Sequence, residues 1–494
     1  MQPRRIHAPL ALLPQGWARD VTMTIDERGM FSDVRSASLR DSVPATTARS
    51  ILRGSAEESS RESDGGYAPL GPIAAGGVVL PGMVNAHSHA FQRAMLGLTH
   101  APAVASPDSN DGGHGNFWSW RTLMYGVALA LTPEQIEAIA TWVYTEMLRG
   151  GYTHVCEFHY LHNAPNGQPY ADAAALSRAV LRAADRVGIG ITLLPVLYMT
   201  SGFGNQPPRD EQRRFISTPS RLVDMIRTLR AERSDDPMQT VGLAPHSLRA
   251  VPPDALDEVV DALRRDAPTA PIHIHIAEQT GEVEACRRWS GMRPVEWLLQ
   301  HQDVDDNWHL VHATHMTPDE SAAVAASGAT VVLCPTTEAD LGDGIFPYRD
   351  FVSREGRIAI GTDSQVSRDW QSELRMLEYG QRLALRERNV GAAHGRSTGE
   401  ALFEAALAGG ARASGLNLSR IEAGARADFV VVREDKLALA ARGADRYLDS
   451  LIFDHHAADF ADVFVGGISR QSSLEGERNG AARAGFVRAL EALR

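Results

Sequence analysis

The sequence predicts an α/β fold, a (β/α)8 barrel of the TIM type with a small β-sandwich domain formed from both chain ends. Between about Val78 and Asp363, short apolar, β-branched segments alternate with amphipathic segments of helical period. The chain has 494 residues, which is long enough for a large barrel with a satellite domain. Strand-like runs near the chain ends, such as 21–25 and 428–432, lack a regular crossover and are expected to pair with each other.

Eight repeats of strand and helix predict a closed barrel. The expected strands are 78–86, 153–159, 189–197, 240–244, 272–277, 308–312, 330–334 and 357–362. The expected helices include 133–149, 171–187, 221–231, 253–265 and 321–327. We therefore expect residues 1–77 and 421–494 to form the two parts of the small β domain, and residues 78–420 to form the barrel. Two stretches rich in small and polar residues, 50–66 and 101–115, are expected to be surface insertions.

The composition is typical of a globular protein with a large core, since 44% of the residues are hydrophobic and 22% are charged. The formal net charge is −12, and Lys and Arg do not cluster beyond short pairs, which argues against a nucleic-acid or anionic-membrane surface. No stretch is long and apolar enough to span a bilayer, and the Ala/Leu run near the start is too short for a signal peptide. The three cysteines, Cys156, Cys286 and Cys334, are widely scattered, which favours a reducing cytoplasm. A small-molecule partner is expected.

Histidines lie at the expected C-terminal ends of two strands. The first strand leads into His87-Ser88-His89. Side chains alternate along a strand, so both imidazoles face one side and can meet a single divalent cation. The fifth strand alternates isoleucine with His273 and His275. His275 lies nearer the catalytic mouth of a barrel, so it is the better ligand candidate, and His273 is the better candidate for a packed interior histidine.

Two further polar residues end expected strands: His312 the sixth and Asp363 the eighth. An aspartate at the end of a buried strand is costly unless it is paired or coordinated. Each of these positions alone is more often structural than functional. Ligand-type residues at the same end of four strands, however, indicate a metal site.

With this pattern the chain resembles the amidohydrolase superfamily, whose members carry H-x-H on strand one, His on strands five and six, and Asp on strand eight. The stretch 421–431 also resembles the β domain of that superfamily where it returns after the barrel. Binuclear members bridge two metals with a strand-four lysine, but Leu243-Ala244-Pro245-His246 stands there, so one metal ion is expected. Zinc is the expected ion, and Fe²⁺ or Mn²⁺ would accept the same ligand types.

Four longer segments, 87–93, 117–121, 157–162 and 201–204, resemble the formimidoylglutamate deiminase family. That family converts N-formimidoyl-L-glutamate and water to N-formyl-L-glutamate and ammonia in histidine degradation. The resemblance implies zinc ligation by His87, His89, His275 and Asp363. It further implies a pocket for a dicarboxylate substrate lined by Gln92, Arg121, Tyr160, His246 and Arg249. An arginine fork binds a carboxylate bidentately, which suits such a substrate.

The residues His275-Ile276-Ala277-Glu278 resemble the H-x-x-E of the deaminase branch, in which the glutamate passes a proton to the departing nitrogen. Zinc would lower the pKa of a bound water toward neutrality. We expect Asp363 and His312 to take up the proton of that water and to stabilise the tetrahedral centre, and Glu278 to protonate the imine nitrogen.

Two other functions fit part of the pattern. A deaminase of the same superfamily that acts on a nucleobase, nucleoside or related amidine would need the same ligands and H-x-x-E, but a flat ring favours apolar or aromatic walls over two arginines. A catalytically silent barrel that binds a metal or a partner would have no need of Glu278. Without the resemblance, Arg121 is equally consistent with a surface residue, and Tyr160 with a core aromatic. A homodimer is expected, with no helix face that assigns the interface.

Overall fold

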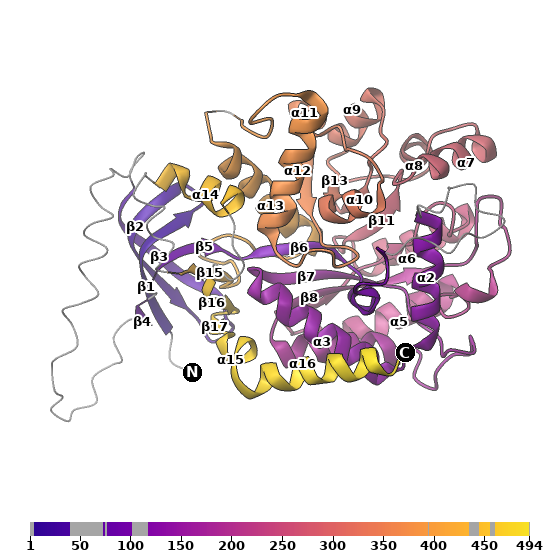
Figure 1. The fold of residues 1–494 in the computed structure, drawn as a ribbon, viewed down its shortest axis with the longest axis horizontal. Helices are drawn as coiled ribbons and strands as arrows, with labels where there is room; N and C mark the ends of the chain where they lie inside the picture. Colours follow the sequence, from indigo (N-terminus) through magenta and orange to yellow (C-terminus); the bar gives the residue numbers. More distant parts are fainter. Residues whose placement is uncertain are drawn as a thin grey trace.

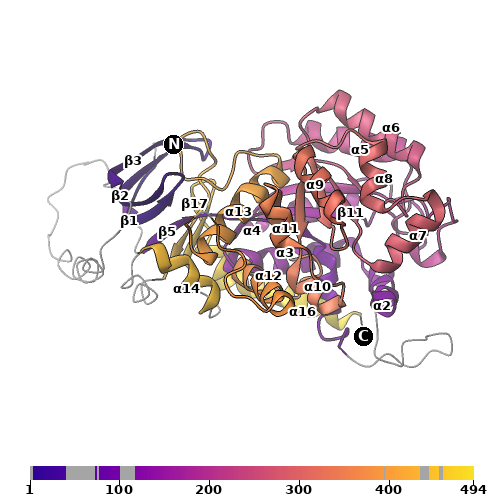
Figure 2. The same ribbon diagram turned by 90° about the horizontal axis from the view of Figure 1, so that it is seen from above.

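The computed structural model describes residues 4–39, 73–74, 77–100, 117–393, 395–433, 444–454 and 460–493. The two expected insertions, 50–66 and 101–115, lie outside these residues. Both views of the ribbon show a barrel with its covering helices at one end and a sheet built around β1, β2 and β3 at the other (Figure 1, Figure 2). No helix in the described ranges is long and apolar enough to cross a membrane.

Eight strand positions form the barrel. They are β6 (Met83–Ser88), β7 (Tyr152–His159), β8 (Gly190–Leu197), β9 (Gln239–Val241) with β10 (Ala244–Pro245), β11 (Ile272–Ile276), β12 (Trp308–His312), β13 (Thr330–Leu333) and β14 (Arg357–Ile360). Successive strands pair in parallel. Two isolated parallel bridges, Leu243 with Ile272 and Ser88 with Asp363, join the remaining edges and close the ring. The expected strands lie at these positions.

Helices cover the outside of the barrel. They are α2 (Phe117–Ala130), α3 (Pro133–Arg149), α4 (Ala175–Val187), α5 (Pro219–Glu232), α6 (Pro253–Asp266), α7 (Thr280–Ser290), α8 (Pro294–His301), α9 (Pro318–Ser327), α10 (Pro335–Leu341), α11 (Tyr348–Ser353), α12 (Trp370–Leu385) and α13 (Thr398–Ser414). Both α3 and α9 begin with a Thr-Pro pair, and in each the threonine caps a backbone N–H while the glutamine or glutamate three residues later caps the threonine. These local signals make the helix starts readable from sequence.

The strands of both chain ends join in one eight-stranded sheet. They are β1 (Arg4–Leu13), β2 (Gly16–Ile25), β3 (Phe31–Leu39), β4 (Ile73–Ala74), β5 (Val78–Pro81), β15 (Phe429–Val432), β16 (Phe460–Val465) and β17 (Ile468–Ser469). The order is β17-β16-β15-β5-β1-β2-β3, with β4 on β1. Along β2, buried Val21, Met23 and Ile25 alternate with partly exposed threonines, and they pack into a second apolar cluster separate from that of the barrel. The predicted α/β barrel with a small β domain from both ends is confirmed.

The first expected strand, 78–86, is two strands in the structure. β5 pairs with β1 and β15 in the terminal sheet, whereas β6 belongs to the barrel. Gly82 separates them, and a Cβ there would lie 2.3 Å from Oγ1 of Thr153, so only glycine fits this close approach. One residue therefore connects the terminal sheet to the strand that carries His87.

The end of the chain is helical and lies on the barrel. After α14 (Tyr447–Phe453), the helices α15 (Gln471–Leu474) and α16 (Gly476–Glu491) follow the last strand. Phe486 of α16 stacks on Trp142 of α3, and Arg149 donates to the carbonyl of Leu474 at 2.8 Å. Figure 1 shows α16 running along α3. The expected division at residues 77 and 420 stays a prediction.

Candidate active site

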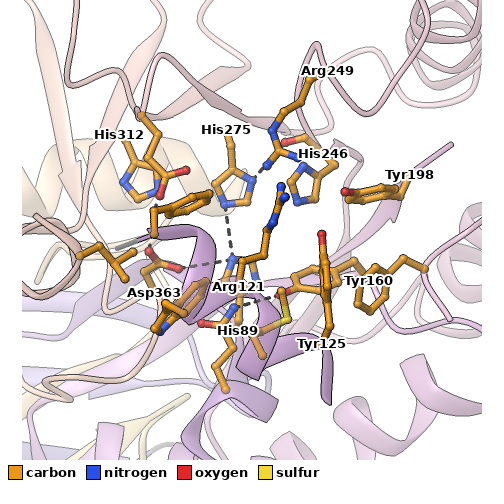
Figure 3. A pocket seen from close by; sticks show the side chains of 17 residues that line it. His89, Arg121, Tyr125, Tyr160, Tyr198, His246, Arg249, His275, His312 and Asp363 are labelled. Atoms are coloured by element: carbon orange, nitrogen blue, oxygen red, sulfur yellow. Dashed lines mark hydrogen bonds and ion pairs between the residues drawn. The ribbon is translucent and has the colours of Figure 1, made fainter. Parts of the chain in front are cut away.

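Three histidine rings meet at the C-terminal mouth of the barrel. The Nε2 atoms of His87, His89 and His275 lie 3.0 to 3.4 Å from one another, and Oδ1 of Asp363 lies 3.5 and 3.4 Å from those of His87 and His89. Nitrogens bound to zinc at about 2.0–2.1 Å in a tetrahedral site are about 3.3 Å apart. The four groups are therefore spaced as ligands of one such ion, and Figure 3 shows three of them, His89, His275 and Asp363.

The tautomers of two of these histidines leave the facing nitrogens free. Nδ1 of His89 donates to the carbonyl of Phe158 at 2.9 Å, and Nδ1 of His275 donates to that of His246 at 3.1 Å. Burial lowers the pKa of His89 and His275, and that of His87 to about 3, so all three rings are neutral. Each Nε2 of His89 and His275 thus carries a lone pair directed at the cluster, as metal ligation requires.

Hydrogen bonds to a buried carboxylate and between backbone groups hold together the segments that carry the candidate ligands. Glu157 accepts from the hydroxyl of Ser88 at 2.6 Å and from the backbone N–H of Ala90 at 2.7 Å, on either side of His89. The N–H of His89 donates to the carbonyl of Asp363 at 3.1 Å. The first and eighth strands are therefore connected at the level of their ligands.

Three strand ends carry non-glycine residues in the left-handed region: Ala277 at φ 49°, His312 at 68° and Asp363 at 46°. This conformation is costly for residues with a side chain and concentrates at functional sites. Here it terminates β11, β12 and β14 abruptly and turns the chain at the mouth of the barrel.

His312 lies among three carboxylates. Its Nδ1 is 3.2 Å from Glu338, and its Nε2 is 3.8 Å from Glu278 and 3.7 Å from Asp363. Burial lowers the pKa of His312, but these carboxylates outweigh it and raise the pKa to about 10. Burial raises the pKa of Glu278 to about 7, against the opposing effect of His312. The pair holds protons at neutral pH next to the histidine cluster.

A second group of possible ligands, His312, Cys334 and Glu338, lies beside the first. Burial raises the pKa of the Cys334 thiol well above its ordinary value. A protonated thiol is a poor metal ligand, because the thiolate is the binding form. The Cys334 thiol is therefore protonated in this arrangement.

A pocket opens over the histidine cluster, with about 520 Å³ of empty space. It brings together all five residues expected to bind substrate and the three expected to act in catalysis: Gln92, Arg121, Tyr160, His246, Arg249, Glu278, His312 and Asp363.

His273, in contrast, lies outside the cluster and donates from Nε2 to the carbonyl of Ala413 at 2.9 Å. Its expected role as a packed interior histidine agrees with this contact.

Two arginines face the pocket from different elements. Arg121 comes from α2, and Arg249 follows β10 by four residues. Figure 3 shows their side chains converging beside His246. Burial and the positive charge of Arg249 lower the pKa of Arg121, and the Nη1 atom of Arg249 is buried without a hydrogen-bond partner among the described residues. Two guanidinium groups that converge in this way suit an anion between them.

Gln92 and Tyr160 form a polar pair on the same wall. Nε2 of Gln92 donates to the hydroxyl of Tyr160 at 2.9 Å, and Oε1 of Gln92 is buried with no partner in the described part of the chain. An unpaired buried acceptor costs free energy that a ligand N–H would recover. The pocket wall therefore presents an unused acceptor, Oε1 of Gln92, in addition to the buried Nη1 donor of Arg249.

Several residues in or beside the pocket were not anticipated from the sequence. Tyr198 directly follows β8, the same position at a strand end that marks the metal ligands, so this signal was available. Tyr125 lies one helical turn after Arg121 on α2, and Glu338 lies in the first turn of α10. Nothing local in the sequence distinguishes these two from structural residues.

The chain is similar to known proteins along nearly its whole length. The model described as the amidohydrolase family matches residues 78–469. A formimidoylglutamate deiminase of Pseudomonas aeruginosa is 44% identical over 488 residues, which cover 98% of each chain. A 5-methylthioadenosine/S-adenosylhomocysteine deaminase of Natronomonas pharaonis is 29% identical over 387 residues, 75% of this chain and 79% of that one. The crystal structure of an amidohydrolase from Brucella melitensis superposes with a TM-score of 0.85 at 42% identity and covers 99% of both chains.

Proposed function

The chain belongs to the amidohydrolase family, and we propose that it is a formimidoylglutamate deiminase, which hydrolyses N-formimidoyl-L-glutamate to N-formyl-L-glutamate and ammonia in histidine degradation. The observation that carries the proposal is the convergence of Arg121 and Arg249 on a pocket that also holds Glu278 above the histidine cluster. Two cationic side chains are suited to binding a dicarboxylate. A buried carboxylic acid is suited to donating the proton with which ammonia leaves. The homodimer and the cytoplasmic location that the sequence favours stay predictions.

We propose that one zinc ion is held by His87, His89, His275 and Asp363. The spacing of the four groups and the free lone pairs of His89 and His275 support this ligand set. Bound zinc supplies Lewis acidity, which lowers the pKa of a water molecule that it binds. Fe²⁺ or Mn²⁺ would accept the same ligands, and availability decides among them.

Glu278 delivers the proton that the leaving nitrogen needs. Water adds to the formimidoyl carbon, the bond from this carbon to the terminal nitrogen breaks, and that nitrogen leaves as ammonia. A carboxylic acid with a pKa of about 7 is protonated in a large fraction of molecules at neutral pH and is a suitable donor.

His312 and Asp363 were expected to share two tasks, proton uptake and stabilisation of the tetrahedral centre. The raised pKa of His312 supports the second task for this residue, because a ring that already holds its proton stabilises negative charge by donation. Glu338 fixes the ring through Nδ1, so that Nε2 faces Glu278 and Asp363. Proton uptake from water then belongs to Asp363.

The opposite wall positions the rest of the substrate. Arg121 and Arg249 bind carboxylate, and Oε1 of Gln92 accepts an N–H of the formimidoyl group. These contacts place the reacting carbon against the cluster rather than adding to the chemical step itself. Neutral His246, whose pKa burial and the charge of Arg249 keep well below its ordinary value, completes this wall without repelling an arginine-bound anion.

A nucleoside deaminase is the second candidate. The specific observation in its favour is the aromatic lining of the pocket, which includes Phe117, Trp120, Tyr125, Tyr160, Tyr198 and Phe215. Such rings could stack on a flat base. The two arginines oppose this candidate, because a neutral nucleoside offers no anion to the buried Nη1 of Arg249.

Ammonia release by zinc-loaded protein tests the proposal. The substrates are N-formimidoyl-L-glutamate, 5′-methylthioadenosine, and N-formimidoyl-L-2-aminobutyrate, which lacks the side-chain carboxylate. Rapid turnover of the glutamate derivative alone is expected. Turnover of the nucleoside alone would replace the proposed function by the second candidate, and equal turnover of both formimidoyl compounds would remove the dicarboxylate assignment.

A further inference from the structure

A buried glutamine lies behind the pocket wall and contacts two of its tyrosines. Gln212 belongs to the short 3-10 helix η3 (Asp210–Gln212) and does not line the pocket. Its Nε2 donates to the hydroxyls of Tyr125 at 3.0 Å and Tyr198 at 2.8 Å. Its Oε1 accepts from the backbone N–H of Arg209 at 2.9 Å. The Arg209 N–H therefore fixes which end of the amide faces the tyrosines.

The hydrogens available on Gln212, Tyr125 and Tyr198 determine which hydrogen bonds the two tyrosines can donate. Both hydroxyl oxygens accept a hydrogen from Gln212, so neither can donate its own hydrogen to that amide nitrogen. Tyr125 and Tyr198 also lie within hydrogen-bond reach of each other, and such a bond uses one hydroxyl hydrogen. At least one hydroxyl hydrogen remains for the pocket. Burial raises the pKa of Tyr198 to about 12, which keeps that hydrogen in place.

This pair of hydroxyls lies away from the histidine cluster and close to the arginines. The ring of His246 lies between, 5.0 Å from the ring of His275 and 4.6 Å from that of Tyr198. Figure 3 shows the hydroxyls of Tyr125 and Tyr198 directed toward the region where Arg121 and Arg249 converge. If the reacting carbon is at the metal ligands, the group that meets these donors is the far end of the substrate.

The segment that carries Gln212 is anchored at its base. The neighbouring side chain of Arg214 is fully buried and donates to the carbonyls of Asn163 at 2.9 Å and Leu131 at 2.7 Å. Phe215 packs against the rings of both Tyr125 and Tyr198. The amide is therefore held rigidly against the tyrosines, as a positioning group must be.

We propose that Gln212 is a positioning residue that orients the hydroxyls of Tyr125 and Tyr198 to donate to the side-chain carboxylate of the substrate, beside Arg121 and Arg249. This assignment rests on the proposed function for the identity of the substrate. It adds two specificity-determining residues and the group behind them to the wall that selects a dicarboxylate. Because the Gln212 amide occupies an acceptor position on each oxygen, the pair presents at least one O–H to the pocket and disfavours a substrate whose far end offers no acceptor.

Product binding to zinc-loaded protein tests the assignment without turnover. Calorimetry gives the dissociation constants of N-formyl-L-glutamate and of N-formyl-L-glutamine, whose side chain ends in a neutral amide, and their ratio measures carboxylate preference. We expect Gln212→Leu to reduce this preference about tenfold, because a hydrogen bond to a charged group is lost or misdirected. Gln212→Glu should reduce it further, since a carboxylate accepts both tyrosine hydrogens and repels the ligand.

Gln239→Leu is the matched control, because Gln239 is equally buried but lies in β9 and bonds to the carbonyl of Leu181. The carboxylate preference of Gln239→Leu should equal that of the wild type. An unchanged preference in Gln212→Leu overturns the assignment. If Gln212→Leu does not fold, the double variant Tyr125→Phe with Tyr198→Phe answers the same question with Gln212 in place. Ammonia release by the wild type is measured separately, so its absence would overturn the proposed function and leave the carboxylate preference to decide this inference.

Discussion

The two ends of the pocket are built differently. At the end proposed to hold the metal, His87 and His275 lie on barrel strands and Asp363 follows β14 by three residues, and backbone hydrogen bonds between neighbouring strands fix their positions. At the carboxylate end, Arg121 comes from a helix and Arg249 from a loop, and side-chain contacts position their neighbours. The barrel strands thus position the groups proposed for catalysis. The helix α2 and the loop after β10 carry the groups proposed to select the substrate.

The largest effect at the metal end is expected for His275→Ala. Loss of this ligand should remove zinc and lower kcat on the order of 10⁴-fold, because activation of water depends on the ion. Zinc content per chain and ammonia release, measured together, check this expectation. A variant that retained one zinc per chain and full activity would remove His275 from the ligand set.

Glu278→Gln separates proton delivery from metal binding. We expect kcat to fall by about 10²–10⁴-fold while zinc content stays at the wild-type level, since the amide keeps the shape but holds no acidic proton. Steady-state kinetics with N-formimidoyl-L-glutamate gives the rate. Retained turnover would assign the proton to another group.

Arg249→Met addresses the carboxylate end. The variant keeps an apolar stem but loses the charge, so KM should rise by roughly 10- to 100-fold with kcat changed only a few-fold. The separation of KM from kcat is the measurement. A fall in kcat with unchanged KM would place Arg249 in the chemical step and contradict the division between the two ends.

The pH dependence of kcat/KM reports on Glu278. Its pKa of about 7 is raised by burial, so the protonated form predominates below that pH and is lost as the pH rises through it. We expect kcat/KM to decline on the alkaline side with a midpoint near neutrality, up to about tenfold per pH unit. Rates from about pH 6 to about pH 9 test this. A flat profile would show that a protonated Glu278 is not required.

His273→Gln is the smallest expected change and the control for His275. His273 lies two residues earlier on the same strand, and a glutamine can still donate to the carbonyl of Ala413. Zinc content and kcat should match the wild type, while the free energy of unfolding falls by roughly 1 kcal/mol. Zinc loss in this variant would mean that the ligand assignments along β11 are wrong.

Local sequence patterns say more about the proposed metal ligands than about the residues at the arginine end of the pocket, for a physical reason. Alternation along a strand and the common position of strand ends are local patterns, so His275 and Asp363 could be proposed as ligands without coordinates. Tyr198 follows a strand too, but a tyrosine there is more often a core residue. Gln212 meets Tyr125 only through tertiary packing across 87 positions of the chain, which no local pattern records.

The strands and helices of the barrel were predicted from periodicity, but two features of the fold were not. The eight strands and the span of α3 follow from hydrophobic pattern and capping. The break at Gly82 was missed because the apolar run continues through it, and only the close approach of Thr153 requires two strands there. The helix α16 was not among the expected helices, because its weakly amphipathic sequence does not distinguish it, and the structure has it packed on α3.

The break at Gly82 also gives the enzyme an order of assembly. β5 lies between β1, which is made first, and β15, which is made late, and Gly82 donates to the carbonyl of Asp428. His87 follows only five residues after that glycine. During synthesis, β5, which Gly82 joins to the strand that carries His87, therefore gains its second neighbouring strand only after β15 has left the ribosome. A chain truncated before β15 should contain all four proposed ligands and still hold the ion poorly, so zinc retention would report that β15 has taken its place beside β5.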